Sequence, residues 1–141
     1  MTVAAQSRLV NRLVNKLRLN ADKIIDYRED EVEGADAVVV TYGITSRTVG
    51  PAIKRARSEG IKVGHFRLVT AWPFPEKRIR EISSKVKSLV VPELNLGQMV
   101  YEVERAAGSR IPVVHVPHAG GTVHDPNDIF DAIRKSVRQT R

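Results

Sequence analysis

The chain contains no cysteine, few aromatic residues and no long apolar run, and each shortage excludes a class of function. Without cysteine there are no disulfides, thiolate nucleophiles, cysteine zinc sites or cysteine-ligated iron–sulfur clusters. No apolar run approaches the roughly 20 residues of a membrane span. The basic residues Arg8, Arg12 and Lys16 interrupt the start, where a signal peptide needs an apolar core. We therefore expect a cytoplasmic protein with no membrane partner.

The composition is otherwise that of one globular domain. The chain has 141 residues, of which 42% are hydrophobic, enough for a core. Its net charge of +7 suggests nucleic acid or an acidic protein as partner, and the alternative is a solvated basic surface. Aromatic residues make up only 5% and do not cluster with the basic ones, so nucleic acid is the less favoured partner.

The apolar spacing separates a leading segment, 1–33, from an α/β region, 34–141, within one domain overall. Residues 7–20 predict a basic amphipathic helix, because their apolar residues recur on one helical stripe. Residues 24–27 predict a lead-in strand at the sheet edge, the one place where we expect an antiparallel strand. An acidic turn is predicted at 29–33.

Strand and helix patterns then alternate four times. Strands are predicted at 37–42, 61–68, 88–91 and 111–116, and helices at 46–59, 75–86, 96–107 and 126–138. This alternation predicts a three-layer α/β/α fold with right-handed crossovers and a mainly parallel sheet of four to five strands. Pro51 predicts that its helix either starts late, near Val49, or has a bent first turn, and Pro92 is expected to end its strand.

No motif of catalysis or cofactor binding is present. The turn at 42–46 has one glycine and no lysine, so neither phosphate-binding glycine motif occurs. The late histidines His115, His118 and His124 lack a clear third metal ligand, since Asp125 is more simply a helix cap. No serine lies in a GxSxG elbow. We predict no catalytic, cofactor-binding or metal-binding residue in this chain.

Two stretches, 70–75 and 92–99, follow predicted parallel strands and therefore lie at the carboxyl edge of the sheet. Open α/β sheets meet ligands and partners at that edge. Aromatic residues are enriched at interface centres, although they could also simply cover the rim of the sheet. We predict a surface for another domain or a second copy, formed by Trp72, Phe74, Glu93, Leu94, Asn95 and Gln98. A buried Glu93 would need a partner that the sequence does not identify.

The same stretches carry a family resemblance. Residues 66–75 (FRLVTAWPFP) and 91–99 (VPELNLGQM) resemble the alpha subunit of 2-oxoacid:ferredoxin oxidoreductases, in particular the 2-oxoglutarate type. Residues 35–43 and 59–64 match its spacing, and the basic helix resembles the segment that leads into its C-terminal domain. The resemblance covers essentially the whole chain and implies a fold like that of the transketolase C-terminal domain. Pro51 departs from the family pattern.

The resemblance implies an assembly domain of an enzyme that oxidatively decarboxylates a 2-oxoacid to an acyl-CoA. Thiamine diphosphate, Mg²⁺, the iron–sulfur cluster and coenzyme A are then expected on other domains or subunits, and ferredoxin binds the complex. The chain alone is expected to be inactive. It would be an isolated domain or a separately encoded piece, because most of a usual alpha subunit is not covered. The alternatives are the equivalent domain of a transketolase or E1-type enzyme, and a basic nucleic-acid-binding module.

Overall fold

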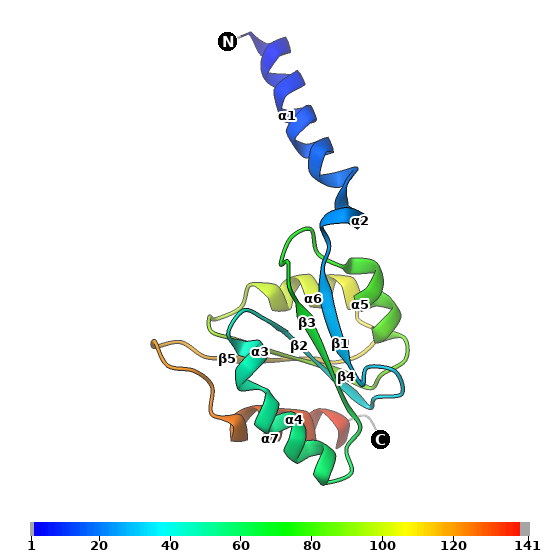
Figure 1. The fold of residues 1–141 in the computed structure, drawn as a ribbon, viewed down its shortest axis with the longest axis vertical. Coiled ribbons are helices and arrows are strands. Elements are labelled where there is room, and N and C mark those ends of the chain that lie inside the picture. The colour runs from blue at the N-terminus through cyan, green and yellow to red at the C-terminus, as the bar shows by residue number, and fades with distance from the viewer. Residues whose placement is uncertain (1, 139–141) are drawn as a thin grey trace.

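The computed structural model describes residues 2–138, which form a five-stranded sheet between two layers of helices (Figure 1). The strands are β1 (Tyr27–Asp30), β2 (Ala37–Tyr42), β3 (Val63–Leu68), β4 (Ser88–Glu93) and β5 (Val113–Pro117). The helices are α1 (Val3–Arg18), α2 (Ala21–Ile24), α3 (Thr45–Thr48), α4 (Gly50–Ser58), α5 (Glu76–Ser83), α6 (Met99–Ala107) and α7 (Pro126–Arg138). The predicted α/β class is confirmed.

The strand order is β1-β3-β2-β4-β5, and β2 to β5 are parallel, as predicted. Strand β1 runs antiparallel to β3, with Tyr27 opposite Leu68 and Asp30 opposite His65. The antiparallel edge strand was expected at 24–27 and begins at the end of that range. The prediction of an acidic turn from residue 29 was wrong for its first two residues, because Glu29 and Asp30 pair with β3.

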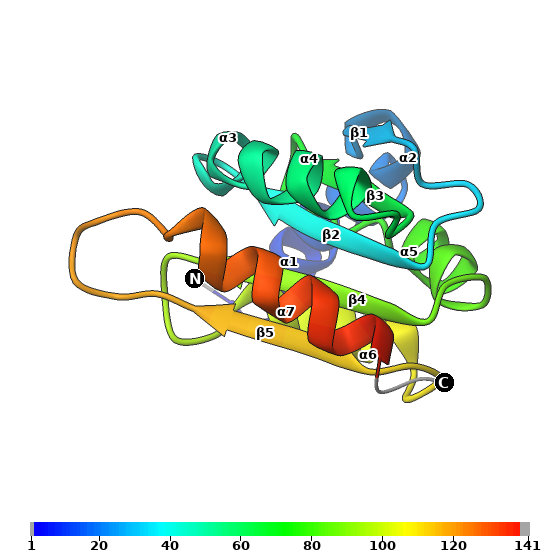
Figure 2. The ribbon, with the colours of Figure 1, turned by 90° about the horizontal axis from the view of Figure 1, so that it is seen from below.

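The core has two halves, one on each face of the sheet. Figure 1 shows α5 and α6 on one side and α4 and α7 on the other, and Figure 2 shows α7 running along β5. Successive residues of β2 serve both halves, since Val38 and Val40 pack toward α5 and α6 while Val39 packs toward α4 and α7. Burying each such side chain stabilises the fold by about 1.5–3 kcal/mol. The continuous apolar run of β2 is therefore that of a strand with helices packed on both of its faces.

Strands β2 and β4 separate toward their carboxyl ends. They pair only from Ala37 opposite Ser88 to Val39 opposite Val90, whereas β4 stays paired with β5 as far as Glu93. Pro92 was predicted to end the strand, but β4 continues through it to Glu93. Pairing between β2 and β4 has already stopped at Val90, so the missing N–H of Pro92 interrupts no hydrogen bond to β2. The chain leaves β2 toward α4 on one face and leaves β4 toward α6 on the other. Such a topological switch point is where open α/β sheets bind ligands or partners.

Two helices start later than their apolar spacing suggested. Helix α4 begins at Gly50 after the short α3, so Pro51 occupies its first turn and the predicted late start near Val49 is confirmed. Helix α6 begins at Met99 instead of at residue 96. The intervening loop turns at Gly97, whose φ of 121° favours glycine. This delay leaves a loop at 94–98 exposed at the carboxyl edge.

Helix α1 stands apart from the sheet. Figure 1 shows it projecting beyond the layers, and none of its side chains is buried. The predicted helix at 7–20 is confirmed in type, but it begins earlier, because the Thr2 hydroxyl accepts a bond from the Ala5 N–H and caps it.

Gly64 on β3 lies directly under the loop that follows β1. A Cβ at this position would lie 2.7 Å from the Val32 Cα and 2.9 Å from the Glu31 carbonyl oxygen. Gly64→Ala should therefore lower the free energy of unfolding by about 1–3 kcal/mol, since backbone must move to admit the methyl group. Urea denaturation followed by circular dichroism measures this loss. Gly50→Ala is the control, because a Cβ there meets no atom within 4 Å; equal midpoints for the two variants would contradict the packing argument.

Candidate docking surface

The Glu93 carboxylate, at the end of β4, caps the start of α6. Its side chain is 0% exposed, and its oxygens accept the backbone N–H groups of Gln98, Met99 and Val100 at 3.2, 2.7 and 2.9 Å. The residue in the N-cap position, Gln98, makes no capping bond with its own side chain. A helix N-terminus carries unpaired N–H donors and a partial positive charge. The sequence did not identify a partner for a buried Glu93, and the structure shows that this partner is the set of backbone N–H groups at the start of α6.

Asn95 connects this cap to β2 across the switch point. Its Nδ2 donates to the Tyr42 hydroxyl at 3.0 Å and to Glu93 at 3.3 Å, while its Oδ1 accepts the Gly97 N–H at 2.8 Å. The Tyr42 hydroxyl donates to Glu93 at 3.4 Å. These bonds fix the loop at 94–98 against the end of β2 at the place where the strands no longer pair.

The electrostatics favour a charged carboxylate. Burial alone would raise the pKa of Glu93, but the backbone N–H groups of α6 and the Asn95 amide outweigh burial and hold it below 4.5. Burial and the neighbouring Glu93 charge raise the pKa of Tyr42 above 10.0. His115 places its Nε2 3.5 Å from Glu93. At neutral pH the cluster therefore holds one anion beside a protonated phenol.

The residues predicted to form the interface divide into exposed and buried groups. Trp72 is 63% exposed and Gln98 is exposed, while Leu94 and Asn95 are half-buried. Phe74 and Glu93 are buried, the former in the core beside α5 and α6. A partner could touch the first four, whereas the last two support the loops from beneath. The interface itself stays a prediction.

The sequence analysis missed other apolar residues at the same edge. Ile44 follows β2, Val69 follows β3, Leu96 follows β4 and Val123 follows β5, and each is exposed. Leu96 is the most exposed of them, at 77%. Every loop that leaves a parallel strand thus carries an uncovered apolar side chain. The sequence contained a signal for these residues, because a large apolar residue in a loop lies outside the apolar spacing of the helices and strands that form the core.

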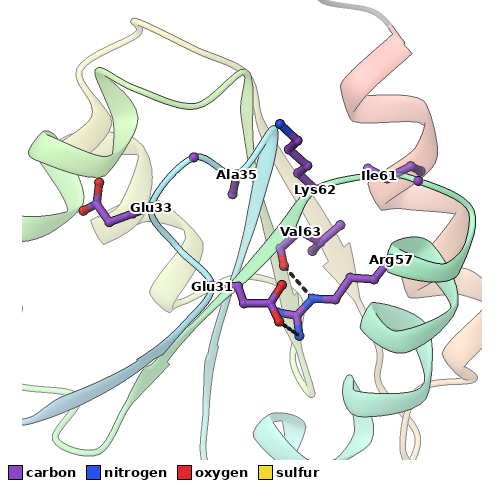
Figure 3. A pocket seen from close by; sticks show the side chains of 9 residues that line it. Glu31, Glu33, Ala35, Arg57, Ile61, Lys62 and Val63 are labelled. Carbon is purple, nitrogen blue, oxygen red and sulfur yellow. Dashed lines mark hydrogen bonds and ion pairs between the residues drawn. The ribbon is translucent and has the colours of Figure 1, made fainter.

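The opposite, amino edge of the sheet is different in character. Figure 3 shows a pocket there, of about 360 Å³, with Glu31 beside Arg57. The Arg57 guanidinium reaches Asp30 at 2.8 Å, Glu31 at 3.2 Å and the Val63 carbonyl at 2.9 Å. Because the Arg57 guanidinium is already bonded to these groups of the fold, it is not free to bind a ligand in this pocket.

The potential metal ligands of the chain form no metal site within residues 2–138. Cysteine is absent from the sequence, and no cluster of three His, Asp or Glu side chains within 2–138 is arranged to hold a metal ion. Two of the late histidines make hydrogen bonds within the fold: His124 Nε2 donates to the Val116 carbonyl at 2.8 Å, and His118 Nε2 pairs with the Thr122 hydroxyl at 2.8 Å. The third, His115, lies with its Nε2 3.5 Å from Glu93. Asp125 accepts the Asn127 N–H at the start of α7, as its predicted capping role requires. No helix within 2–138 has the length and apolarity to cross a membrane.

Comparisons with known proteins agree on a family. Residues 35–129 match the pyruvate:ferredoxin oxidoreductase core domain II. The 2-oxoglutarate synthase subunit KorA of Methanothermobacter marburgensis is 44% identical over 126 residues, which is 89% of this chain and 34% of the relative. This chain therefore spans about a third of the length of that relative.

Two solved structures share the fold. The first is a 2-oxoglutarate:ferredoxin oxidoreductase from Magnetococcus marinus with 2-oxoglutarate, coenzyme A and succinyl-CoA bound. It has a TM-score of 0.80 and 27% identity, and the match covers 96% of this chain and 24% of that one. The second, a split-gene transketolase described as an inactive beta4 tetramer, has a TM-score of 0.69 and 22% identity, with 81% and 42% covered. The expected likeness to transketolase is thus confirmed at the level of fold.

Glu93→Gln should lower the free energy of unfolding by about 2–3 kcal/mol at neutral pH, because an NH2 group replaces one of the two oxygens that accept the N–H groups of α6 and the negative charge is lost. A depressed folded-state pKa stabilises the fold above pH 4.5, and this stability is lost as the pH falls through the folded value. The difference between variant and wild type should therefore shrink on acidification.

Denaturant titrations from neutral pH to about pH 3 measure this change. Glu102→Gln is the matched control, because Glu102 makes a surface ion pair with Arg105 and should contribute at most about 0.5 kcal/mol. A difference that stays constant with pH would show that the charge of Glu93 is not the cause.

Proposed function

Because the chain belongs to the pyruvate:ferredoxin oxidoreductase core domain II family, we propose that it is an assembly domain of a 2-oxoacid:ferredoxin oxidoreductase. The enzyme would oxidatively decarboxylate a 2-oxoacid, with 2-oxoglutarate favoured by the relatives, to an acyl-CoA with ferredoxin as electron acceptor. This domain would hold neighbouring subunits or domains in place without supplying reacting groups. The same relatives favour this function over transketolase chemistry and over nucleic-acid binding.

The observation that carries the proposal is where the exposed apolar side chains lie. Within residues 2–138 the large exposed apolar residues fall on α1 with its C-cap, on the loops at the carboxyl edge, and at Tyr101 near the start of α6. None of those described lies at the amino edge. Apolar surface concentrated at one end of a domain is typical of an interface. The docking surface we propose consists of Ile44, Val69, Trp72, Leu94, Asn95, Leu96, Gln98 and Val123.

The cofactors would be held elsewhere in the assembly. A chain without cysteine supplies no thiolate ligands for an iron–sulfur cluster. The loop after β2 has no lysine and a single glycine, Gly43, so it lacks the features of a diphosphate-binding loop. We propose that thiamine diphosphate, Mg²⁺, the cluster and coenzyme A all bind to other subunits or domains.

Trp72→Ser combined with Leu96→Ser should weaken assembly while the fold is retained, because both side chains are exposed in the domain. We expect about tenfold weaker association with the remaining subunits, since interface aromatic residues often contribute more than 1 kcal/mol each. Co-purification and light scattering measure assembly, and circular dichroism measures the fold. Lys62→Ser with Lys85→Ser changes the amino edge as control; equal loss in both variants, or no loss in either, would contradict the proposed surface.

The chain alone should neither bind thiamine diphosphate nor reduce a viologen dye with 2-oxoglutarate and coenzyme A. Isothermal calorimetry with Mg²⁺ and thiamine diphosphate tests the first statement, and dye absorbance the second. The reassembled enzyme, which should show both properties, is the positive control. Micromolar binding of thiamine diphosphate to this chain alone would refute the proposed division of roles.

A further inference from the structure

Helix α1 has an apolar stripe that nothing in the described chain covers. The stripe is formed by Leu9, Val10, Leu13, Val14 and Leu17, and between 37% and 52% of each of these side chains is exposed. Residues spaced three and four apart share one face of a helix, so these five form a continuous strip about two turns long. A soluble helix rarely keeps such a face in water, because most helical stability comes from packing that face.

The charge on α1 is of one sign and lies mainly along one side. Residues 1–21 contain four basic side chains and no Asp or Glu. Arg8, Arg12 and Lys16 follow one another at intervals of four and form a row beside Leu9 and Leu13. The other side of the apolar stripe carries mostly neutral groups.

These neutral groups are Ser7, Asn11 and Asn15, again at intervals of four. The remaining basic residue, Arg18, lies in the last turn, where a cation favours the helix C-terminus. The polar surface of α1 is therefore asymmetric along most of its length.

We infer that α1 docks into an apolar groove, on another polypeptide segment of the assembly, that carries carboxylates along one wall. The inference rests on the proposed function, because it takes that assembly as the source of the groove. The apolar stripe would fill the floor, and the row of Arg8, Arg12 and Lys16 would meet the acidic wall. The one-sided charge sets the direction and rotation of the helix in its groove, since the reversed helix would place the row against the wrong wall.

Two other occupants fit the helix less well. A second copy of α1 offers no acidic residue to the basic row: an antiparallel pair would bring the two basic rows together, and a parallel pair would set each row against neutral side chains. A membrane surface favours helices with aromatic anchors at the interface and basic residues on a broad polar face. Helix α1 has no aromatic residue, and its polar face is largely neutral on one side.

The base of α1 is fastened to the proposed docking surface. The Thr70 Oγ1 accepts the Asp26 N–H at 2.9 Å and donates to the Ile24 carbonyl at 3.1 Å, and the Val69 N–H donates to the Asp26 carbonyl at 3.0 Å. The loop that carries Trp72 is thus tied to the segment from which α1 projects. A partner that binds Trp72 would therefore lie close to α1, where a groove on the same partner could bind the helix.

The test uses the full chain, produced with an affinity tag in the cells it comes from and purified with its complex. A photo-crosslinking amino acid replaces Leu13, in the apolar stripe, or Asn15, on the opposite face, as matched control. We expect position 13 to crosslink efficiently to a segment rich in Asp and Glu outside α1, and position 15 to give little product. Mass spectrometry identifies the crosslinked peptides.

A charge-reversed variant, Arg8→Glu with Arg12→Glu and Lys16→Glu, should reduce recovery of the complex about tenfold or more. Lys54→Glu with Lys62→Glu and Lys77→Glu makes the same change in net charge at exposed positions of the domain and should leave recovery unchanged. Equal losses would overturn the inference in favour of general charge effects. Crosslinking of position 13 to a second α1, or no excess over position 15, would also overturn it.

Flotation with vesicles containing phosphatidylglycerol tests the lipid alternative at physiological salt. The wild-type chain should stay unbound, and binding that the α1 reversal abolishes would overturn the inference. The proposed function can fail separately. If Trp72→Ser with Leu96→Ser disrupts assembly and the α1 reversal does not, the docking of α1 is wrong and the assembly role stands. If the wild-type chain purifies without any partner, the assembly role itself is wrong.

Discussion

The buried carboxylate of Glu93 at the start of α6 is the interaction on which the carboxyl edge depends. It satisfies three backbone N–H groups that have no partner within the helix, and it stays charged because those groups surround it. Strand β4 ends at this residue, α6 begins at Met99, and the loop at 94–98 lies between them at the carboxyl edge. Glu93 is buried while Leu96, three residues on, is 77% exposed, so a structural carboxylate supports the loop that a partner would meet.

The arrangement of strands and helices could be predicted from sequence because it follows from local patterns. The apolar run of β2 and the alternation that follows it indicate a parallel sheet, and Pro51 indicates where α4 begins. The role of Glu93 could not be predicted in this way. Its partners are backbone groups of a helix whose first residue depends on the same contact, so neither the cap nor the late start is visible in the spacing alone.

The candidate surface was predicted in part for a similar reason. Trp72 is exposed at the carboxyl edge, as an interface residue has to be, but Phe74, two residues on, is buried in the core next to α5 and α6. The sequence identifies aromatic residues near an edge of the sheet without showing which of them are buried in the core. The apolar loop residues such as Leu96 become informative only when the fold brings the four strand ends together. Helix α1 shows the converse, since its uncovered stripe is visible in the sequence and only the structure shows that the domain does not cover it.

The short pairing between β2 and β4 also has a consequence for motion. Only three residue pairs join the two strands, against six between β2 and β3, so the sheet consists of two better-bonded halves with a weak seam between them. Fluctuations of the native domain should concentrate at this seam and be widest at its carboxyl end. There the bonds that join Tyr42 of β2 to Asn95 and Glu93 are side-chain bonds that span the opening. A partner bound across both loops would hold the halves together, and its arrival would stiffen the domain as a whole.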